Sequence, residues 1–456
     1  MTLVEKLAKF VVNASWKSLS QEAQAALKIR VLDSLGCAIG ALNGVPVRYI
    51  RKHIDEFGGS EMCTMIGGGK TAPDRAAFYN SALVRYLDFN DSYLSKGETC
   101  HPSDNLGSVL AAAEYANCSG REFLTGLAVA YQVQCRLSDV APVRAKGFDH
   151  TTQGSYAVSA GVSKVLGLDT TRTANAVAIS GTAFNALRVT RTGALSHWKG
   201  LAYPNTALCA THATFLAMRG ITGPMGVFEG NKGFMESIAG SFTIDWSSEN
   251  LESVNRTIIK KYNAEIHSQS SIEGALQLQA EHHFMPEDIS HIEISIFDVA
   301  YNIIGGGEEG DKAHIATKEE ADHSLPYMVA VALLDGDVTP AQYRPERIQK
   351  EDVQTLLRKI LVNPVAEYSK RFPDSMPVRL TVTLKDSRVF IIERDDYEGF
   401  HTRPMPWEKV VKKFIRLTES FTDDVLRQEI ISAVDNLENI NVKELTNLLG
   451  EVKNEK

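Results

Sequence analysis

The hydrophobic pattern changes its period once along the chain, and this change constrains the fold more than any other feature. Up to residue 240, apolar residues keep helical spacing, as in Leu27, Val31 and Leu35, and no convincing strand pattern occurs. After residue 260, apolar and polar residues alternate over 292–296 and again over 378–384. The chain therefore combines a helical part with a later part that contains a sheet.

From Pro406 onward the apolar spacing is helical once more. We therefore predict a mainly α fold with an α+β insert, in a chain long enough for more than one domain. The expected parts are a large all-helical domain over 1–265, a smaller α+β lid domain over 266–404, and C-terminal helices over 405–456 that return to the helical domain. Inside the insert, residues 319–335 and 346–361 are predicted to be helices.

Helix starts are marked by residues that can cap them. Pro73 suits the first turn of a helix, with Thr71 as the expected cap and Asp74 in the place of a capping-box acid. Ser119 and Glu122 form a second capping-box pair and predict a helix through about residue 137.

The stretch from Arg85 to Asn105 is the richest in groups that handle protons. Asp88, Asp91, Glu98 and His101 lie within it, where a predicted helix gives way to a loop. Asp88 and Asp91 are three residues apart and are expected to share a face at the end of that helix. Acids at a helix C-terminus oppose the helix dipole, which disfavours placing them there for stability alone. A functional site and a solvated interhelical loop both stay open at this point.

Composition excludes several classes of protein. The net charge of −8 argues against general affinity for nucleic acid or membranes, and an anionic ligand would need a local cluster of basic residues. No apolar run reaches the length of a membrane span, and no signal peptide is evident. A cytoplasmic location is therefore expected.

Six cysteines are scattered along the chain without a C-x-x-C pair, so they are read as reduced thiols. Only Cys100, beside His101, has a sequence context that suggests a nucleophile, and a buried bystander thiol is the better interpretation. The cysteines also lack the spacing of an iron–sulfur site. The expected activity is therefore free of cofactors and metals.

Three further segments carry residues capable of function: His150 in a polar loop, Lys199, and Lys260 with Lys261 ahead of Glu265 and His267. A polycarboxylate bound to an acidic protein would need cations, and the sequence offers a basic set for this purpose. That set consists of Arg188, Arg191, Lys199, Lys260 and Lys261.

Taken in order, these segments resemble the MmgE/PrpD family, whose members include 2-methylcitrate dehydratase, aconitate decarboxylase and iminodisuccinate epimerase. The resemblance spans essentially the whole chain. It is carried by the motifs at 87–92 (LDFNDS), 100–105 (CHPSDN), 147–150 (GFDH), 196–200 (SHWKG), 260–269 (KKYNAEIHSQ) and 321–327 (ADHSLPY). The first and fifth of these are the most specific.

The resemblance implies a large helical domain, a smaller α+β lid, an active site between them and a homodimer. It assigns catalytic positions to Asp91, His101, His150, Lys199 and Lys260. The expected substrate-binding residues are Ser95, Arg188, Arg191, Lys261, Glu265 and His267.

This sequence departs from the family pattern at three positions. Ala202 and Tyr203 stand where many relatives have a histidine, and Asn263 replaces a common proline. Glu265-Ile266-His267 resembles the dehydratase branch more than the decarboxylase branch.

The expected reaction is the dehydration of a citrate-like tricarboxylate, first of all 2-methylcitrate in propionate catabolism. Removing a proton beside a carboxylate builds negative charge there, which Lys199 and Lys260 would stabilise. His101, oriented by Asp91, is the candidate base and His150 the candidate acid, although the two roles could be reversed.

Alternative functions stay open at this stage. Within the family, decarboxylation of cis-aconitate and epimerisation compete with dehydration. A class I isoprenoid synthase-like magnesium enzyme would also be helical and would use a D-x-x-D motif such as Asp88 to Asp91. A helical binding module without catalysis is the last alternative.

Overall fold

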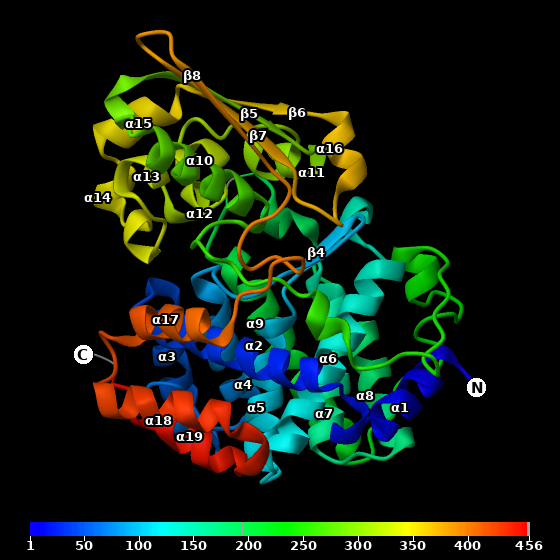
Figure 1. Cartoon of the computed structure of the whole chain (residues 1–456). Helices are drawn as coiled ribbons and strands as arrows, with labels where there is room; N and C mark the ends of the chain where they lie inside the picture. The colour runs from blue at the N-terminus through cyan, green and yellow to red at the C-terminus, as the bar shows by residue number, and fades with distance from the viewer. Residues whose placement is uncertain (194, 454–456) are drawn as a thin grey trace. The chain divides into compact units, whose positions relative to one another are not determined.

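The computed structural model describes residues 1–193 and 195–453 as two compact units (Figure 1). The larger unit comprises residues 1–191, 197–258 and 406–456, and the smaller one comprises residues 192–196 and 259–405. The chain therefore leaves the larger unit after Ile258 and re-enters it at Pro406.

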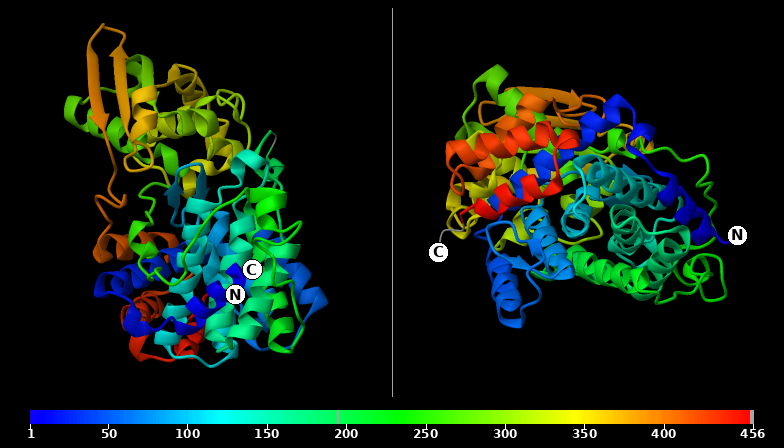
Figure 2. Two further views of the ribbon diagram at one scale, coloured as in Figure 1. Left: turned by 90° about the vertical axis from the view of Figure 1, so that its right-hand side faces the viewer. Right: turned by 90° about the horizontal axis from the view of Figure 1, so that it is seen from below.

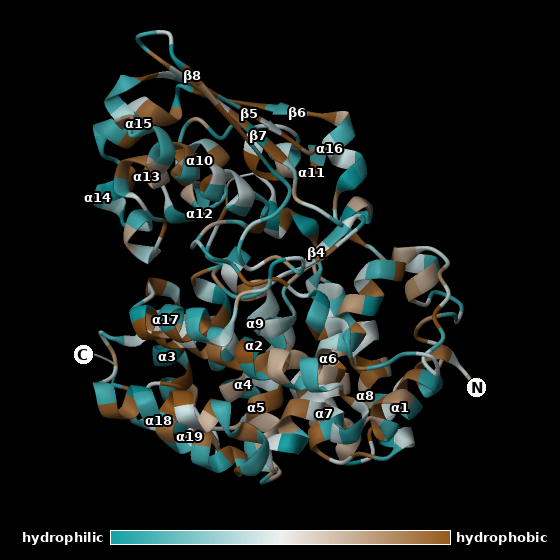
Figure 3. Ribbon diagram, in the orientation of Figure 1, coloured by the Kyte–Doolittle hydropathy of each residue, from teal (hydrophilic) through white to brown (hydrophobic). Residues whose placement is uncertain are grey.

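The larger unit is helical. Its helices are α1 (Leu3–Asn13), α2 (Gln21–Gly40), α3 (Val45–Phe57), α4 (Pro73–Tyr86), α5 (Leu106–Tyr115), α6 (Gly120–Val140), α7 (Thr151–Val165), α8 (Thr170–Ala183), α9 (Trp198–Met218), α17 (Trp407–Thr418), α18 (Asp424–Asp435) and α19 (Val442–Glu451). Figures 1 and 2 show α1 and the pair α18 and α19 on opposite sides of this unit. Both hydrophilic and hydrophobic residues appear along α18 and α19 in Figure 3, as expected for helices at a surface.

Close helix packing in this unit depends on small residues. A Cβ atom at Gly126 would lie 2.4 Å from a methyl carbon of Val165, and one at Gly161 would lie 2.9 Å from the carbonyl oxygen of Gly126. Helices α6 and α7 can therefore approach each other only where these glycines face each other. This contact fixes the C-terminal part of α7, the helix that His150 precedes.

The smaller unit has a four-stranded mixed sheet in the order β6-β5-β7-β8, in which only the β5–β6 pair is parallel. The strands are β5 (Ile289–Ile296), β6 (Ile360–Pro364), β7 (Val378–Leu384) and β8 (Val389–Arg394). The helices are α10 (Gln269–His282), α11 (Asp298–Ala300), α12 (Lys318–Ala321), α13 (Leu325–Asp335), α14 (Pro345–Ile348), α15 (Glu351–Leu357) and α16 (Ala366–Arg371). Helix α10 packs on β7 and β8, and α13 packs against both α10 and α15.

Several predictions of secondary structure are confirmed. The mainly α fold with an α+β part is observed, and β5 and β7 lie where the alternating pattern placed them. Ser119 and Glu122 form the predicted capping box at the start of α6. The C-terminal tail is helical, as predicted from its apolar spacing, with α17, α18 and α19.

Other predictions are wrong in detail. Helix α4 starts after Ala72, and Thr71 instead pairs with Cys63 in a short hairpin of β1 (Cys63–Thr64) and β2 (Lys70–Thr71). A second short hairpin, β3 (Tyr93–Ser95) with β4 (Glu98–Cys100), also falls in the part where no strand was expected.

The helices expected inside the insert are broken or replaced. The one over 319–335 is interrupted between Ala321 and Leu325, because Ser324 caps a new helix. The one over 346–361 ends early, and its last residues begin strand β6. No helix in the described part of the chain has both the length and the apolar character that crossing a bilayer requires.

A buried lysine joins the returning helix α17 to the start of the chain. The Nζ atom of Lys413 lies 2.7 Å from Oδ1 of Asp33 on α2, and both side chains are buried. The same ammonium donates to the carbonyl oxygen of Phe89 at 2.8 Å and lies 3.7 Å from the centre of the Phe89 ring. Lys413 therefore holds the loop that follows α4 against α2 and α17.

Replacing Lys413 by Met is expected to lower the free energy of unfolding by about 3 to 5 kcal/mol, because Asp33 would keep a buried charge without its partner. Chemical denaturation measures this loss. The matched control is Lys412→Met at the exposed neighbouring position, which should change stability by no more than about 0.5 kcal/mol. Equal effects at the two positions would contradict a buried ion pair.

Candidate active site

The loop after α4 starts with a buried ion pair. Helix α4 ends at Tyr86, and Asp88 has a positive φ of 53°, so it lies beyond the helix. Arg85 donates from Nη1 to Oδ1 of Asp88 at 2.6 Å, and Nζ of Lys199 lies 3.5 Å from the other carboxylate oxygen. The expected shared helical face of Asp88 and Asp91 is therefore wrong, because the backbone turns between them.

Asp91 anchors this loop through its carboxylate. Oδ1 accepts the backbone N–H of Ser103 at 3.0 Å, and Oδ2 accepts the hydroxyl of Tyr131 at 2.7 Å. Burial raises the pKa of Asp91, although these hydrogen bonds oppose the increase. The carboxylate thus ties the loop to α6 and to the turn ahead of α5.

His101 is oriented by Asp91, but through the main chain and not through the carboxylate as predicted. Its Nδ1 lies 2.8 Å from the carbonyl oxygen of Asp91 and 3.1 Å from the hydroxyl oxygen of Ser92. A carbonyl oxygen only accepts, so Nδ1 carries the hydrogen and Nε2 carries the lone pair. Nε2 lies 3.4 Å from Nη2 of Arg85, which can donate to it.

His150 lies beside His101. The two ring centres are 5.5 Å apart at an angle of 70°, and both side chains are buried. Neither ring nitrogen of His150 has a hydrogen-bond partner among the described residues. Burial lowers the pKa of His150 to about 3, and Arg191, Arg85 and Arg188 add to this effect, so the imidazole is neutral near pH 7.

The carboxylate of Asp149 lies between His150 and two of the predicted cations. It accepts from Nε of Arg191 at 2.5 Å, and Nη1 of Arg188 lies 3.9 Å away. Burial alone would raise the pKa of Asp149, but Arg191, His150 and Arg188 hold it well below its usual range. Arg188 and Arg191 were predicted to bind substrate, and the structure places both beside His150 with an ionised partner.

These contacts form one connected group within the larger unit. It runs from Lys199 through Asp88 and Arg85 to His101, then through His150 to Asp149 and its two arginines. We call this group the imidazole cluster, and it consists of Arg85, Asp88, His101, Asp149, His150, Arg188, Arg191 and Lys199.

Sequence reasoning missed several residues of this region. Arg85 was not selected, although a charged residue between the apolar Val84 and Leu87 is a signal that could have been followed. Asp104 was also missed: Nδ2 of Asn90 donates to it at 2.9 Å, and Nε of Arg85 lies 3.8 Å away. Burial raises the pKa of Asp104 to about 7, although Arg85 opposes the shift.

Tyr203 stands at a position where many relatives were expected to have a histidine. Its hydroxyl donates to Oδ1 of Asn105 at 2.9 Å, and its ring centre lies 6.2 Å from that of His150. The departure from the family pattern therefore falls next to the imidazole cluster.

Ser95, Glu98 and Cys100 belong to the β3–β4 hairpin. The hydroxyl of Ser95 donates to the carbonyl oxygen of Ser138 at 3.1 Å, and the carboxylate of Glu98 accepts the backbone N–H of Val143 at 3.0 Å. Cys100 is buried as a free thiol and packs with other apolar side chains. These contacts hold the hairpin in place, and none of them joins Ser95 to the imidazole cluster.

The remaining predicted residues lie in the smaller unit. Glu265 accepts from Nδ1 of His267 at 2.7 Å, and Lys260 is fully buried. Burial alone would raise the pKa of Glu265, but His267, His323 and Lys260 lower it to about 2, so the carboxylate is ionised. Nε2 of His267 has no hydrogen-bond partner in the described residues.

Lys261 differs from its neighbour Lys260. Its ammonium is half-buried and pairs with Glu273 at 2.8 Å and with Glu398 at 3.2 Å. Two carboxylates within the same unit therefore already neutralise the charge that was expected to bind substrate.

The sequences of both units are similar to those of known proteins. Residues 5–247 match the MmgE/PrpD N-terminal domain, and residues 262–439 match the MmgE/PrpD C-terminal domain. The chain is 27% identical over 391 residues to a 2-methylcitrate dehydratase of Escherichia coli O157:H7, covering 78% of this chain and 77% of that protein.

Of two further relatives, one carries the same name and one a different name. A 2-methylcitrate dehydratase of Salmonella typhi is 29% identical over 364 residues, covering 73% of this chain and 71% of that protein. A cis-aconitate decarboxylase of Mus musculus is 25% identical over 439 residues, covering 91% of this chain and 86% of that protein. Since the two domain matches together span most of the sequence, the chain belongs to the MmgE/PrpD family of enzymes.

Proposed function

We propose that this protein dehydrates a citrate-like tricarboxylate, with 2-methylcitrate as the first candidate substrate and 2-methylaconitate as its product. The observation that carries the proposal is the buried pair His101 and His150, with ring centres 5.5 Å apart and cations on both sides. Elimination of water from a hydroxy acid needs one group that removes a proton and one that protonates the departing hydroxyl. Two adjacent imidazoles can supply both functions.

Cations of the imidazole cluster supply the second requirement. Removing a proton from the carbon beside a carboxylate moves negative charge onto that carboxylate, so a fixed cation there lowers the barrier. Lys199 is buried with its ammonium 3.5 Å from Asp88, and Arg85 is buried between Asp88 and His101. We assign the charge-stabilising role to Lys199, with Arg85 as a further positive group.

His101 is the better base of the two. Its Nδ1–H is held by the carbonyl oxygen of Asp91, so the proton would be accepted by the lone pair of Nε2, which faces Nη2 of Arg85 at 3.4 Å before substrate binds. The bond to a main-chain carbonyl also fixes the ring plane, as a general base requires. Asp91 acts here as a positioning residue.

His150 would take the acid role after substrate binding. Its pKa of about 3 keeps the imidazole neutral near pH 7, and the one N–H of a neutral imidazole is a very weak acid. A bound tricarboxylate would offset the charges of Arg85, Arg188 and Arg191, which lower this pKa, and would itself favour the imidazolium. Binding of the anion would therefore raise the pKa of His150. The protonated imidazole would then donate its proton to the departing hydroxyl.

The smaller unit offers two further candidates. His267 is held by the ionised Glu265, and the ammonium of Lys260 is buried among these groups. We propose that Lys260 and His267 also contribute to the reaction. The predicted homodimer, the cytoplasmic location and the place in propionate catabolism remain predictions.

A second candidate function is decarboxylation of cis-aconitate. It is favoured by the decarboxylase of Mus musculus, which matches 91% of this chain. Decarboxylation also starts from a carboxylate held by cations, so the imidazole cluster alone does not separate the two reactions. The chemistry must be read from the products.

Offering the purified, chelator-treated protein 2-methylcitrate, citrate and cis-aconitate in separate reactions tests the proposal directly. Dehydration should convert 2-methylcitrate into an unsaturated tricarboxylate, seen by NMR and by mass spectrometry as the loss of one water. Release of carbon dioxide from cis-aconitate would support the second candidate instead. Absence of reaction with all three would contradict both.

Replacing His101 by Asn is expected to lower kcat/KM by about 10²- to 10⁴-fold, because Asn keeps a donor for the Asp91 carbonyl but cannot accept the proton. The variant should still be stabilised against heat by citrate, since a ligand that binds only the folded state raises its apparent stability. The control is His197→Asn at an exposed position, which should keep the activity within about twofold. Equal activity in the two variants would remove His101 from the reaction.

The depressed pKa of His150 predicts how stability depends on pH. Between its unfolded value of 6.5 and its folded value of about 3, the unfolded chain binds more protons at this residue, so the native protein loses stability as the pH falls. A His150→Asn variant lacks this loss. Its unfolding free energy relative to the native sequence should therefore rise toward acid by up to about 1.4 kcal/mol per pH unit.

Chemical denaturation of both proteins over this range measures the difference. Above pH 7 the two curves should run parallel, which provides an internal control. Parallel curves down to pH 4 would show that His150 is not a depressed, neutral imidazole.

A further inference from the structure

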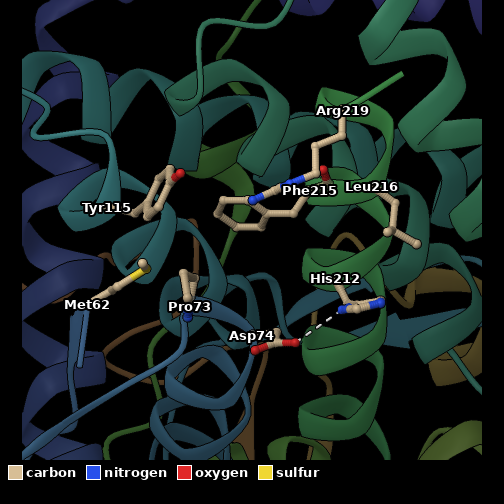
Figure 4. A pocket seen from close by; sticks show the side chains of 8 residues that line it. All are labelled: Met62, Pro73, Asp74, Tyr115, His212, Phe215, Leu216 and Arg219. Carbon is tan, nitrogen blue, oxygen red and sulfur yellow. Dashed lines mark hydrogen bonds and ion pairs between the residues drawn. The ribbon is translucent and has the colours of Figure 1, made fainter. Parts of the chain in front are cut away.

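The larger unit holds a cavity of about 320 Å³ that none of the imidazole-cluster residues line (Figure 4). It is lined by side chains from the start of α4, from the last residue of α5 and from the end of α9. Helices α4 and α9 pack along each other. Their other ends carry Arg85 and Lys199, which both bind Asp88.

The helix length separates the cavity from the imidazole cluster. Asp74 lines the cavity and Arg85 belongs to the cluster, and their separation of eleven positions corresponds to about 16 Å of α-helix. The cavity is therefore a distinct site at the opposite end of the same pair of helices.

Its walls are apolar and open to solvent. Tyr115 and Phe215 meet edge to face with ring centres 4.9 Å apart. Met62, Tyr115 and Leu216 remain 48%, 37% and 36% exposed, so three large apolar side chains reach the surface around one opening. Cavities of this size with aromatic walls and a few polar groups are typical of small-molecule sites.

The polar groups stand at two ends of the cavity, as Figure 4 shows. At one end Nδ1 of His212 lies 3.2 Å from Oδ2 of Asp74, so this carboxylate already has a partner. At the other end Arg219 uses Nη1 to bind the carbonyl oxygen of Phe215 at 3.1 Å. No carboxylate of the described residues pairs with Arg219, and its guanidinium keeps further donors.

We propose that this cavity, here called the α4–α9 cavity, binds a small aromatic monocarboxylate. The ring of the ligand would lie against Tyr115 and Phe215, and its carboxylate would accept from Arg219. Arginine favours this class because its planar donors match a carboxylate in pairs. One cation without a carboxylate partner suits one negative charge, whereas the proposed substrate of the imidazole cluster carries three.

Phenylacetate is the probe, and saturation-transfer NMR on the full-length protein measures its binding. A ligand of about ten heavy atoms should show saturable binding with a Kd of roughly millimolar size. Phenylacetamide has the same shape without the charge and should bind at least about 10-fold more weakly.

Variants locate the binding. Arg219→Gln should weaken phenylacetate at least about 10-fold and leave phenylacetamide nearly unchanged, because only the ion pair is lost. Leu216→Glu should weaken both ligands, with an unchanged melting temperature as the check on folding. Arg172→Gln, an exposed arginine on α8, is the matched control and should bind like the native protein.

A carboxylate could also enter the imidazole cluster, so Lys199→Gln is the decisive comparison. Phenylacetate binding that survives Lys199→Gln and fails in Arg219→Gln supports the proposal. The reverse pattern overturns it, as does the absence of saturable binding up to about 10 mM. If light scattering shows a dimer that Leu216→Glu dissociates, a second copy of the chain covers the cavity and the proposal fails.

Discussion

The structure of the larger unit depends on the pairing of one buried guanidinium group, that of Arg85. Arg85 lies near the end of α4, almost without access to water, and its three nitrogens face Asp88, Asp104 and His101. A buried charge is tolerated only when it is paired and hydrogen-bonded, so these residues must keep their places for the unit to fold. The contacts of Arg85 that order the loop after α4 therefore also place Nε2 of His101 beside the guanidinium. Stability and reactivity share one set of contacts here.

The elements that the sequence predicted well are those whose burial repeats regularly. Strands β5 and β7 each bury one face, and the alternation of Ile and Val with polar residues reports that burial directly. Strand β6 was missed because it is short, lies at an edge of the sheet and keeps only Ile360 buried, so it shows no alternation. Two hairpins of two- and three-residue strands carry too few residues to show any period.

The candidate site was also predictable only in part. The types of side chain were predictable, because imidazoles and lysines in polar loops are visible in the sequence, and the structure brings His101, His150 and Lys199 into one group. Their partners were not predictable. His101 is oriented by a main-chain carbonyl, which every residue possesses, and Asp91 is held by Tyr131, forty positions away in the sequence. The sequence also could not show that Lys261 pairs with Glu273 and Glu398.

The path of the chain has a consequence for the order of folding. Helix α2 packs against α17, and Asp33 finds its lysine there, but 147 residues of the smaller unit are made between Ile258 and Pro406. At a synthesis rate of about 5 to 20 residues per second, the nascent larger unit waits roughly 7 to 30 seconds for its last helices. During that interval the face of α2 that packs against α17 stays uncovered, and the smaller unit can complete its own sheet first. The smaller unit is thus expected to be folded before α17 packs against α2 and completes the larger unit.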